Sequence, residues 1–335
     1  MGEKRKNRRP TQGTIAEKAG ISVGAVSRAL ADDPLIAPKT RALVFRIARE
    51  VGYTPDRAAQ RLRTGRSNVI SLILPPHEEI LGFGTSIIRG ISTVLSGTPY
   101  HLVVMPDFDM EQSDAQVRRI VREGLADGIL FSRTEPNDLR ARYLLEADFP
   151  FVCHGRTELA SKHPFVDFDN LEFARIAVKE LVAKGASNLM ILMPPEGLTF
   201  RNHLMQGFMS AIRESGVKYE ILDTVTLGST PDSIEAAIKQ RFARSDRPDG
   251  LILPGETSGL ASLAAIQDLG LVLGKDVHVV VKQTSGVFDF VRPRVPSLYE
   301  DLTAAGEMLA NLLLQRIAGE PSENLQFLQP VSETP

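Results

Sequence analysis

The sequence predicts an α/β protein in which a small helical head precedes a larger, doubly wound body. Three observations lead to this prediction. Residues 1–66 hold 15 Lys and Arg against 6 Asp and Glu, whereas residues 67–335 hold 24 against 35, so a cationic segment precedes an anionic one. Short helical patterns with turn signals fill the cationic segment. From Asn68 onward, short apolar runs alternate with amphipathic stretches, which is typical of parallel sheets covered on both faces by helices.

The composition is that of an ordinary globular chain, with 43% hydrophobic and 24% charged residues among 335. No apolar run approaches the roughly 18 residues that a membrane helix needs. The basic N-terminus lacks the apolar segment of a secretory signal. The single cysteine, Cys153, has no partner for an internal disulfide and is expected to be buried on a strand. We therefore expect a cytoplasmic protein that does not associate with membranes.

The stretch "TIAEKAGISVGAVSRAL" predicts two short helices joined by a tight turn. Ile15 and Ala19 share one helical face, and Gly20 supplies the left-handed residue that ends a helix. Ser22 is placed to cap a second helix, in which Val26 faces inward. This is a helix-turn-helix, and its second helix would present its outward side to the major groove of DNA. The outward positions are Val23, Gly24, Ala25, Ser27 and Arg28.

A third helix is predicted in "APKTRALVFRIAREVGY". Pro38 suits the first helical position, Val44 and Ala48 lie on the inward stripe, and Gly52 closes the helix. Three such helices can share one small core. Because the basic residues are spread through this whole segment and not confined to its tail, we expect a head that binds a polyanion.

The body contains strand-like runs at 69–74, 100–105, 128–131, 149–154, 188–193, 249–254 and 276–281. Helical stretches are expected at 87–95, 113–123, 171–184, 205–214, 233–243, 258–269 and 302–317. So many units exceed one compact sheet, and we expect two lobes. In open α/β sheets ligands bind beyond the carboxyl ends of the strands, so the loops that follow the strands are the expected site.

The segments "AGISVGAVSRAL" and "GYTPDRAAQRLRTGRSN", followed by "DGIL", "VDFDN" and "QGF", resemble the lac-repressor (LacI/GalR) family of bacterial transcription factors. The resemblance continues with gaps to about residue 330. It implies a DNA-binding headpiece at 1–57, a hinge helix and linker at 58–67, and an effector-binding and dimerisation core at 68–335. It further implies a type I, periplasmic-binding-protein-like core of two lobes joined by three crossovers. We expect these lobes at 68–169 plus 284–300 and at 170–283 plus 301–330.

The resemblance also implies the DNA contacts. In that family a hinge leucine is wedged into the minor groove; by position it is Leu62, with Ala58 and Ala59 facing the groove beside it. Packing of Leu62 on the core is the alternative. We further expect Thr14 and Ser22 among the DNA contacts. Arg61, Arg63 and Arg66 are expected to neutralise phosphates, with a merely solvated cation as the alternative for each.

Arg28 is the strongest candidate for reading a base edge, because a guanidinium can bind guanine through two hydrogen bonds; a phosphate contact is the alternative. Val23 and Gly24 occupy the family's main specificity positions but offer no side-chain hydrogen bond. Half-site recognition is therefore expected to use thymine methyl groups and DNA shape. Gln12 and Gly13 depart from the family pattern, which places the expected start of the first helix near Thr14.

The effector site that the resemblance implies lies in loops after the strands. Phe83 matches an aromatic residue that flanks the effector in relatives, with an ordinary lid hydrophobe as the alternative. His154 and Arg156 in "CHGRT" follow the fourth strand, and Gly155 stands where relatives usually carry aspartate. A structural hydrogen bond is the alternative for His154. Asp169 matches the family's Asp-Asn step, but capping the next helix is at least as good an explanation.

Two departures from the family concern charged residues. The family's effector-binding arginine aligns with Leu204, and Arg201 and Asn202 lie one turn earlier. The late family aspartate aligns near Gln283, with Lys282 beside it. We expect Arg201, Asn202, Lys282 and Gln283 to contribute to the site. The ligand is expected to carry several hydroxyl groups, and an anionic group paired with Lys282, Arg156 or Arg201 is left open.

These observations predict a sequence-specific transcriptional repressor that binds a palindromic operator as a homodimer under allosteric control by a small molecule, expected to be a sugar. Residues 318–335 lack leucine heptads, which favours a dimer over a tetramer. A solute-binding protein without a regulatory role is the alternative. An enzyme is not expected, because we find no Walker loop, HExxH motif or cysteine cluster, and neither a cofactor nor a metal is implied. The carboxylate pairs Asp32–Asp33 and Glu78–Glu79 are expected to be solvated.

Overall fold

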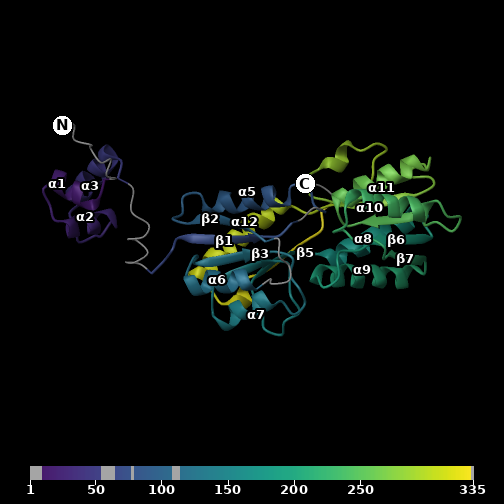
Figure 1. Ribbon diagram of the computed structural model, residues 1–335, viewed down its shortest axis with the longest axis horizontal. Helices are drawn as coiled ribbons and strands as arrows, with labels where there is room; N and C mark the ends of the chain where they lie inside the picture. Colours follow the sequence, from purple (N-terminus) through teal and green to yellow (C-terminus); the bar gives the residue numbers. More distant parts are fainter. Residues whose placement is uncertain (1–9, 54–64, 77–78, 108–113, 333–335) are drawn as a thin grey trace, which may run out of the picture. The chain divides into compact units, whose positions relative to one another are not determined.

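The computed structural model describes residues 10–53, 65–76, 79–107 and 114–332. The contacts divide the chain into two compact units, Met1–Ser67 and Asn68–Pro335, which we call the head and the body (Figure 1). Within the described part of the chain, no helix is both long enough and apolar enough to cross a lipid bilayer.

The head consists of α1 (Gln12–Ala19), α2 (Val23–Leu30) and α3 (Pro38–Val51). Ile15, Val26 and Val44, one from each helix, are fully buried against one another and form the centre of its core. The predicted turn is confirmed: Gly20 is left-handed with φ 65°, and the Ser22 hydroxyl accepts a hydrogen bond from the Ala25 amide at 3.2 Å.

The predicted start of the first helix is wrong. Helix α1 begins at Gln12, because Thr11 and Thr14 form a reciprocal cap. The Thr14 amide donates to the Thr11 hydroxyl at 3.4 Å, and the Thr11 amide donates to the Thr14 hydroxyl at 3.1 Å. A threonine thus fulfils the role that Glu or Gln usually takes at the third helical position, and the helix starts two residues earlier.

The first lobe of the body is a six-stranded parallel sheet in the order β11-β5-β4-β3-β1-β2 (Figure 1). Helices α5 and α12 pack on one face and α6 and α7 on the other. The backbones of α5 and α12 lie in direct contact at Gly90. A Cβ atom at this position would lie only 2.1 Å from the Thr303 carbonyl oxygen, so only glycine fits there. The elements are β1 (Val69–Leu74), α5 (Phe83–Leu95), β2 (His101–Pro106), α6 (Ala115–Glu123), β3 (Gly128–Phe131), α7 (Leu139–Glu146), β4 (Phe151–His154), β5 (Phe165–Phe168), α12 (Leu302–Ile317) and β11 (Gln326–Gln329).

The second lobe is a five-stranded parallel sheet in the order β10-β9-β8-β6-β7. Helices α8 and α9 cover one face, and α10 and α11 cover the other. Two 3-10 turns, η2 (Val287–Phe290) and η3 (Ser322–Asn324), lie in the later part of the chain. The other elements are α8 (Asn170–Ala183), β6 (Asn188–Leu192), α9 (Thr199–Ser215), β7 (Lys218–Leu222), α10 (Pro231–Phe242), β8 (Gly250–Leu253), α11 (Glu256–Asp268), β9 (His278–Gln283) and β10 (Ser297–Tyr299).

The predicted assignment of the last two segments to lobes is wrong. Strand β10 pairs with β9, so residues 284–300 belong to the second lobe. Helix α12 and strand β11 belong to the first lobe, because Leu302 and Leu309 pack into the core that contains Ile70 and because β11 pairs with β5. The chain therefore crosses between the lobes at residue 169, at residues 300–301 and at residues 330–331.

Candidate functional site

The outward side of α2 is the candidate DNA-reading surface of the head. Val23 has 49% of its surface exposed, Gly24 and Arg28 are also exposed, and Ala25 and Ser27 are partly exposed. Val26 and Ala29 are buried on the opposite side, so the helix has one side for packing and one for contact. The predicted hinge contacts Ala58, Ala59, Arg61, Leu62 and Arg63 lie outside the described residues. Arg66 is described and exposed.

A cleft lies between the lobes of the body, at the carboxyl ends of β1, β3, β4, β5 and β9. Its volume is about 470 Å³, including space open to solvent. Phe83, His154 and Lys282, which the sequence predicts as effector contacts, line it, and the rings of Phe83 and His154 meet edge to face at 5.4 Å. The remaining lining residues are Glu79, Ile80, Arg133, Thr134, Gly155, Asp167, Asn170, Phe200 and Glu300.

Buried ion pairs dominate the polar lining of the cleft. One Arg133 nitrogen, Nη2, lies 2.8 Å from each carboxylate oxygen of Glu79. The Glu79 side chain is only 4% exposed, so the expectation that it is solvated is wrong: Arg133, far away in sequence, compensates the burial of its charge. The Lys282 ammonium lies 2.8 Å from Glu300, and both side chains are buried.

The other five predicted effector residues do not line the cleft. Arg156 does not line the cleft. Its guanidinium donates to Asp167, which does line it, at 2.7 Å. Asp169 caps α8 by accepting from the Glu172 amide at 3.0 Å, which is the alternative role left open for it. The other three residues donate hydrogen bonds elsewhere. Arg201 donates to the Pro194 carbonyl, Asn202 to Glu158 at 2.8 Å, and Gln283 to Ser297 at 2.8 Å.

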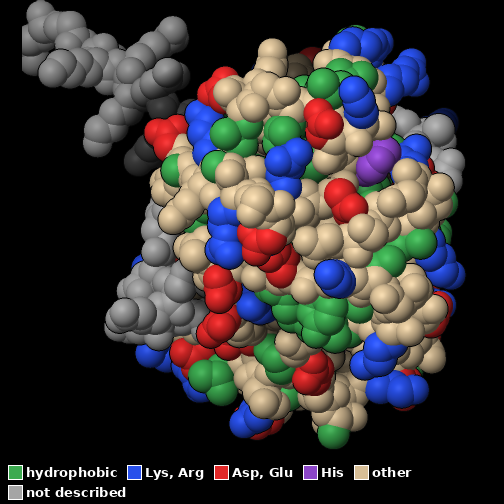
Figure 2. Space-filling model, turned by 90° about the vertical axis from the view of Figure 1, so that its right-hand side faces the viewer, with side chains coloured by type: hydrophobic (Ala, Val, Ile, Leu, Met, Phe, Trp, Pro, Cys, Tyr) green, Lys and Arg blue, Asp and Glu red, His purple; other side chains and the backbone are tan. Residues whose placement is uncertain are grey.

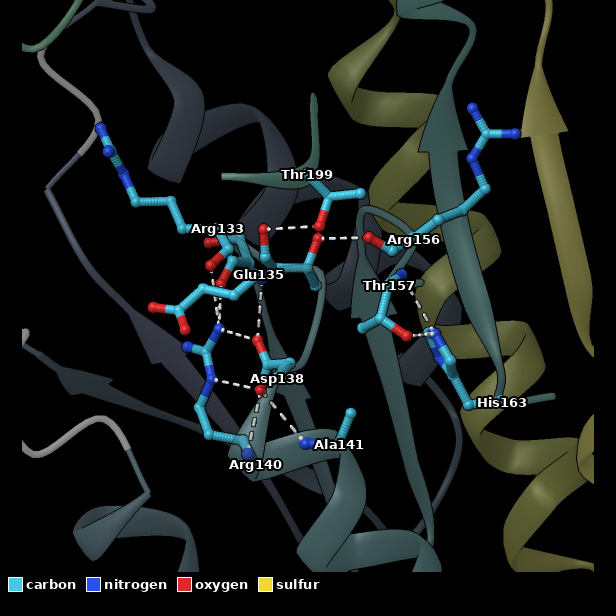
Figure 3. A network of polar contacts seen from close by, with 11 residues as sticks. Arg133, Glu135, Asp138, Arg140, Ala141, Arg156, Thr157, His163 and Thr199 are labelled. Carbon is cyan, nitrogen blue, oxygen red and sulfur yellow. Dashed lines mark hydrogen bonds and ion pairs between the residues drawn. The ribbon is translucent and has the colours of Figure 1, made fainter. Parts of the chain in front are cut away.

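A second set of contacts joins the lobes beside the cleft. The Thr199 amide and hydroxyl, in the second lobe, donate to the Thr134 carbonyl oxygen at 2.9 and 3.1 Å (Figure 3). The Thr134 hydroxyl donates to the Arg156 carbonyl at 2.8 Å. Asn202 reaches Glu158 across the same seam. The seam therefore fixes the loop after β3, which carries Arg133 and Thr134 into the cleft.

The loop after β3 rests on a buried ion pair between Asp138 and Arg140 (Figure 3). Arg140 Nη2 lies 2.7 Å from Asp138 and also donates to the carbonyl oxygens of Ser132 and Arg133 at 3.2 and 2.9 Å. Asp138 in turn caps α7 by accepting from the amides of Arg140 and Ala141. Arg133 has a positive φ of 54°, which the Arg140 hydrogen bonds help to hold.

Burial shifts the pKa of several groups around the cleft. It raises the pKa of Asp167 to about 6, against the opposing influence of Arg156. It lowers the pKa of His154, and it lowers that of His203 to about 4 with help from the positive charge of Arg156. Among the described residues, no cluster of His, Cys, Asp and Glu could hold a metal ion.

These pKa shifts predict opposite pH effects for two neighbouring residues. An unfolded histidine has a pKa near 6.5, so the neutral burial of His203 favours folding above about pH 6.5, and this contribution is lost as the pH falls toward about 4. The raised pKa of Asp167 works in the other direction and favours folding in acid. We expect His203→Gln to reduce the acid loss of unfolding free energy by about 1–2 kcal/mol at pH 5, and Asp167→Asn to increase it. Urea unfolding at pH 7.5, 6 and 5 measures both; equal slopes in the two variants would contradict the assignment.

The sequence patterns did not reveal Glu79, Arg133, Asp167, Asn170 or Glu300 as lining residues. The place of each of these residues in the cleft is set by a partner that is distant in sequence or by a crossover whose position the sequence does not reveal. One signal was available for Asp167, since it lies within the "VDFDN" segment at the end of a strand. Phe200 and Thr134 carry no local signal at all.

Comparison with known proteins agrees with this architecture. Residues 14–56 match the family described as "Bacterial regulatory proteins, lacI family", and residues 178–332 match "Periplasmic binding protein-like domain". The HTH-type transcriptional regulator AglR of Rhizobium meliloti (strain 1021) is 31% identical over 91% of this chain and 87% of its own. The HTH-type transcriptional regulator CelR of Thermobifida fusca is 27% identical over 96% of each chain. Both relatives are named as regulators, which does not favour the solute-binding alternative.

Two solved structures share the fold. A complex of the transcriptional regulator CelR with cellobiose is 25% identical, has a TM-score of 0.69, and covers 97% of this chain and 98% of its own. The lac repressor dimer bound to operator and the anti-inducer ONPF is 20% identical, with a TM-score of 0.83 and coverage of 97% of each chain. The chain belongs to the LacI family of bacterial transcriptional regulators.

Proposed function

We propose that this protein is a transcriptional repressor that binds operator DNA through α2 of the head and releases or tightens its grip when a neutral sugar binds in the cleft of the body. The observation that carries the proposal is the combination of an exposed recognition helix with a separate two-lobed body whose cleft is lined by ion pairs and aromatic rings. On the face of the body seen in Figure 2, Lys and Arg are interspersed with Asp and Glu.

The pairing of charges supports a neutral ligand. Lys282 is paired with Glu300 and Arg156 with Asp167, while Arg201 is bound to a backbone carbonyl. None of the three cations considered for an anionic ligand is thus without a partner. Hydroxyl groups can donate to the carboxylates and accept from the cations without breaking the charge balance, and the rings of Phe83 and Phe200 offer apolar surface to a sugar.

Thermal unfolding of the full chain tests the ligand class. The panel contains cellobiose, maltose, melibiose, raffinose and the aldonic acid of cellobiose. A sugar at 100 times its Kd adds about 2.7 kcal/mol to the unfolding free energy and raises Tm by several degrees. We expect a neutral sugar to give the largest shift and Arg201→Ala, outside the lining, to respond as wild type does. A larger shift with the acid would contradict the proposal.

We further propose that the protein acts as a homodimer on a palindromic operator. Large apolar side chains are exposed on the body: Val103 on edge strand β2, Leu260 on α11, and Phe290 on η2, which is 85% exposed. The lac repressor, which shares the fold, is described as a dimer on its operator. Light scattering of Phe290→Asp and Leu260→Asp should show a shift from dimer to monomer. A monomeric wild-type chain at micromolar concentration would refute the dimer.

The repressor role has its own test. Deleting the gene should raise transcription from promoters that overlap the bound sites, because a repressor that occupies them is removed. A fall in transcription on deletion would identify an activator and overturn this part of the proposal.

A further inference from the structure

The three crossovers between the lobes are bonded to one another. The Asp169 amide on the first crossover donates to the Gln329 carbonyl at 3.0 Å, next to the third. The Gln329 side chain donates to the Asp301 carbonyl on the second crossover at 3.2 Å. Hydrogen bonds to backbone carbonyl oxygens therefore join the third crossover to the first and to the second. A change in the angle between the lobes has to strain or break these hydrogen bonds.

A single side chain ties the first crossover to the second from inside the cleft. Lys282, at the end of β9, lies 2.8 Å from the carboxylate of Glu300 on the second crossover. It also donates to the side-chain oxygen of Asn170, directly after the first crossover, at 3.3 Å. The Lys282 side chain is only 4% exposed, and its ammonium lies 5.1 Å from the centre of the Phe168 ring. A buried lysine with two anchoring partners is held in one place.

All three members of this contact, Lys282, Glu300 and Asn170, line the cleft. An ammonium has three N–H donors; Asn170 accepts one of them, whereas Glu300 is held by charge and its Oε2 has no hydrogen-bond partner. The remaining donors can reach a hydroxyl oxygen of a sugar in the cleft. A ligand that binds there contacts the Lys282 ammonium, and it can either strengthen or weaken the contacts of Lys282 with Glu300 and Asn170 that hold the two crossovers together.

We propose that Lys282 is the positioning residue that converts sugar binding into a change of lobe geometry, by bracing the first crossover against the second. This inference rests on the proposed function, since it assumes a sugar in the cleft and DNA binding by the head. It also makes a claim about the free protein: without the brace, the crossovers open more readily while each lobe keeps its own sheet.

The first test needs no ligand. Hydrogen exchange of the full chain is compared for wild type, Asn170→Ala, Lys282→Met, and the double variant Lys282→Met with Glu300→Gln, which leaves no buried charge unpaired. We expect peptides that span residues 169 and 299–301 to exchange about tenfold faster in all three variants, with β1 and β8 unchanged. The control is Arg241→Met, which removes a largely buried cation of the second lobe whose partner, Glu220, lies on strand β7, at the opposite edge of the sheet from β10. Wild-type exchange at the crossovers in the double variant would overturn the brace.

The second test measures coupling. Operator affinity is titrated on a duplex selected by the wild-type chain from a random library, with and without each neutral sugar of the panel at saturation. The wild-type ratio of affinities is expected at about 5–150-fold. We expect a ratio of less than about twofold in the double variant and an undiminished ratio in the control Arg241→Met. A full ratio in the double variant would show that Lys282 does not transmit the signal. No DNA or sugar response in wild type would instead refute the proposed function, while the exchange experiment would still decide on the brace.

Discussion

Replacing Arg140 by methionine is expected to lower the unfolding free energy of the body by about 3–5 kcal/mol. The Asp138 side chain is 2% exposed, and its charge would lose its ion-pair partner in the interior. The carbonyl oxygens of Ser132 and Arg133 would also lose a donor. Arg140 further packs its guanidinium over the Phe131 ring, 4.4 Å from its centre. Urea unfolding at pH 7.5 measures the loss.

The double variant Asp138→Asn with Arg140→Met separates the charge from the packing. Asparagine can still cap α7, so the helix start is retained while the unpaired charge is removed. We expect this variant to recover more than half of the lost stability. If Arg140→Met alone costs less than about 1 kcal/mol, the ion pair does not support the loop after β3.

Replacing Arg28 by alanine is expected to weaken operator binding by about 2–6 kcal/mol in the dimer, which is about 30-fold at the least. Arg28 is exposed on the outward side of α2, and a guanidinium that reads a guanine contributes about 1–3 kcal/mol at each half-site. Two half-sites double the loss. Fluorescence anisotropy with the selected operator and with a random duplex at fixed salt measures it.

A control variant distinguishes base reading from phosphate contact. Arg46→Ala, on α3, removes an exposed arginine of the same head and is expected to change affinity about twofold or less. If Arg28→Ala weakens operator and random duplex equally and lowers the salt dependence by about one charge per half-site, Arg28 binds phosphate and does not read a base.

The head could be predicted well because its signals are local. The left-handed Gly20, the cap at Ser22, the proline at position 38 and the closing Gly52 each act within one turn of helix. The one error, the start of α1, arose because threonine at position 14 takes the capping role of a longer side chain.

In the body, periodicity predicted many of the strands and most of the helices, but not β5, β7, β10, β11 or α7, and it did not predict which strands pair. Strand β5 is interrupted by Asp167 and β7 is an exposed edge, so neither has the apolar pattern of a central strand. The lobe assignment failed because the apolar side of α12 fits either sheet by composition. In the structure, Leu302 and Leu309 pack into the core of the first lobe, and the close backbone approach at Gly90 and Gly306 holds α12 against α5.

The location of the cleft could be predicted, because parallel sheets bind ligands beyond the carboxyl ends of their strands. Its chemistry could not. Glu79 and Arg133 are 54 residues apart, and Lys282 and Asn170 are 112 residues apart. No local pattern indicates such pairs, so exposed-looking charges in the sequence proved to be buried partners in the fold.

The most direct test of the account removes residues 1–67 and leaves the body, Asn68–Pro335, which forms a compact unit by its own contacts. A sugar-dependent rise in Tm of the truncated chain verifies that it is folded and still senses its ligand. We predict that this rise matches that of the full chain while affinity for the selected operator falls to the level of random duplex or below. Operator binding that survives the truncation undiminished would contradict the assignment of DNA reading to the head.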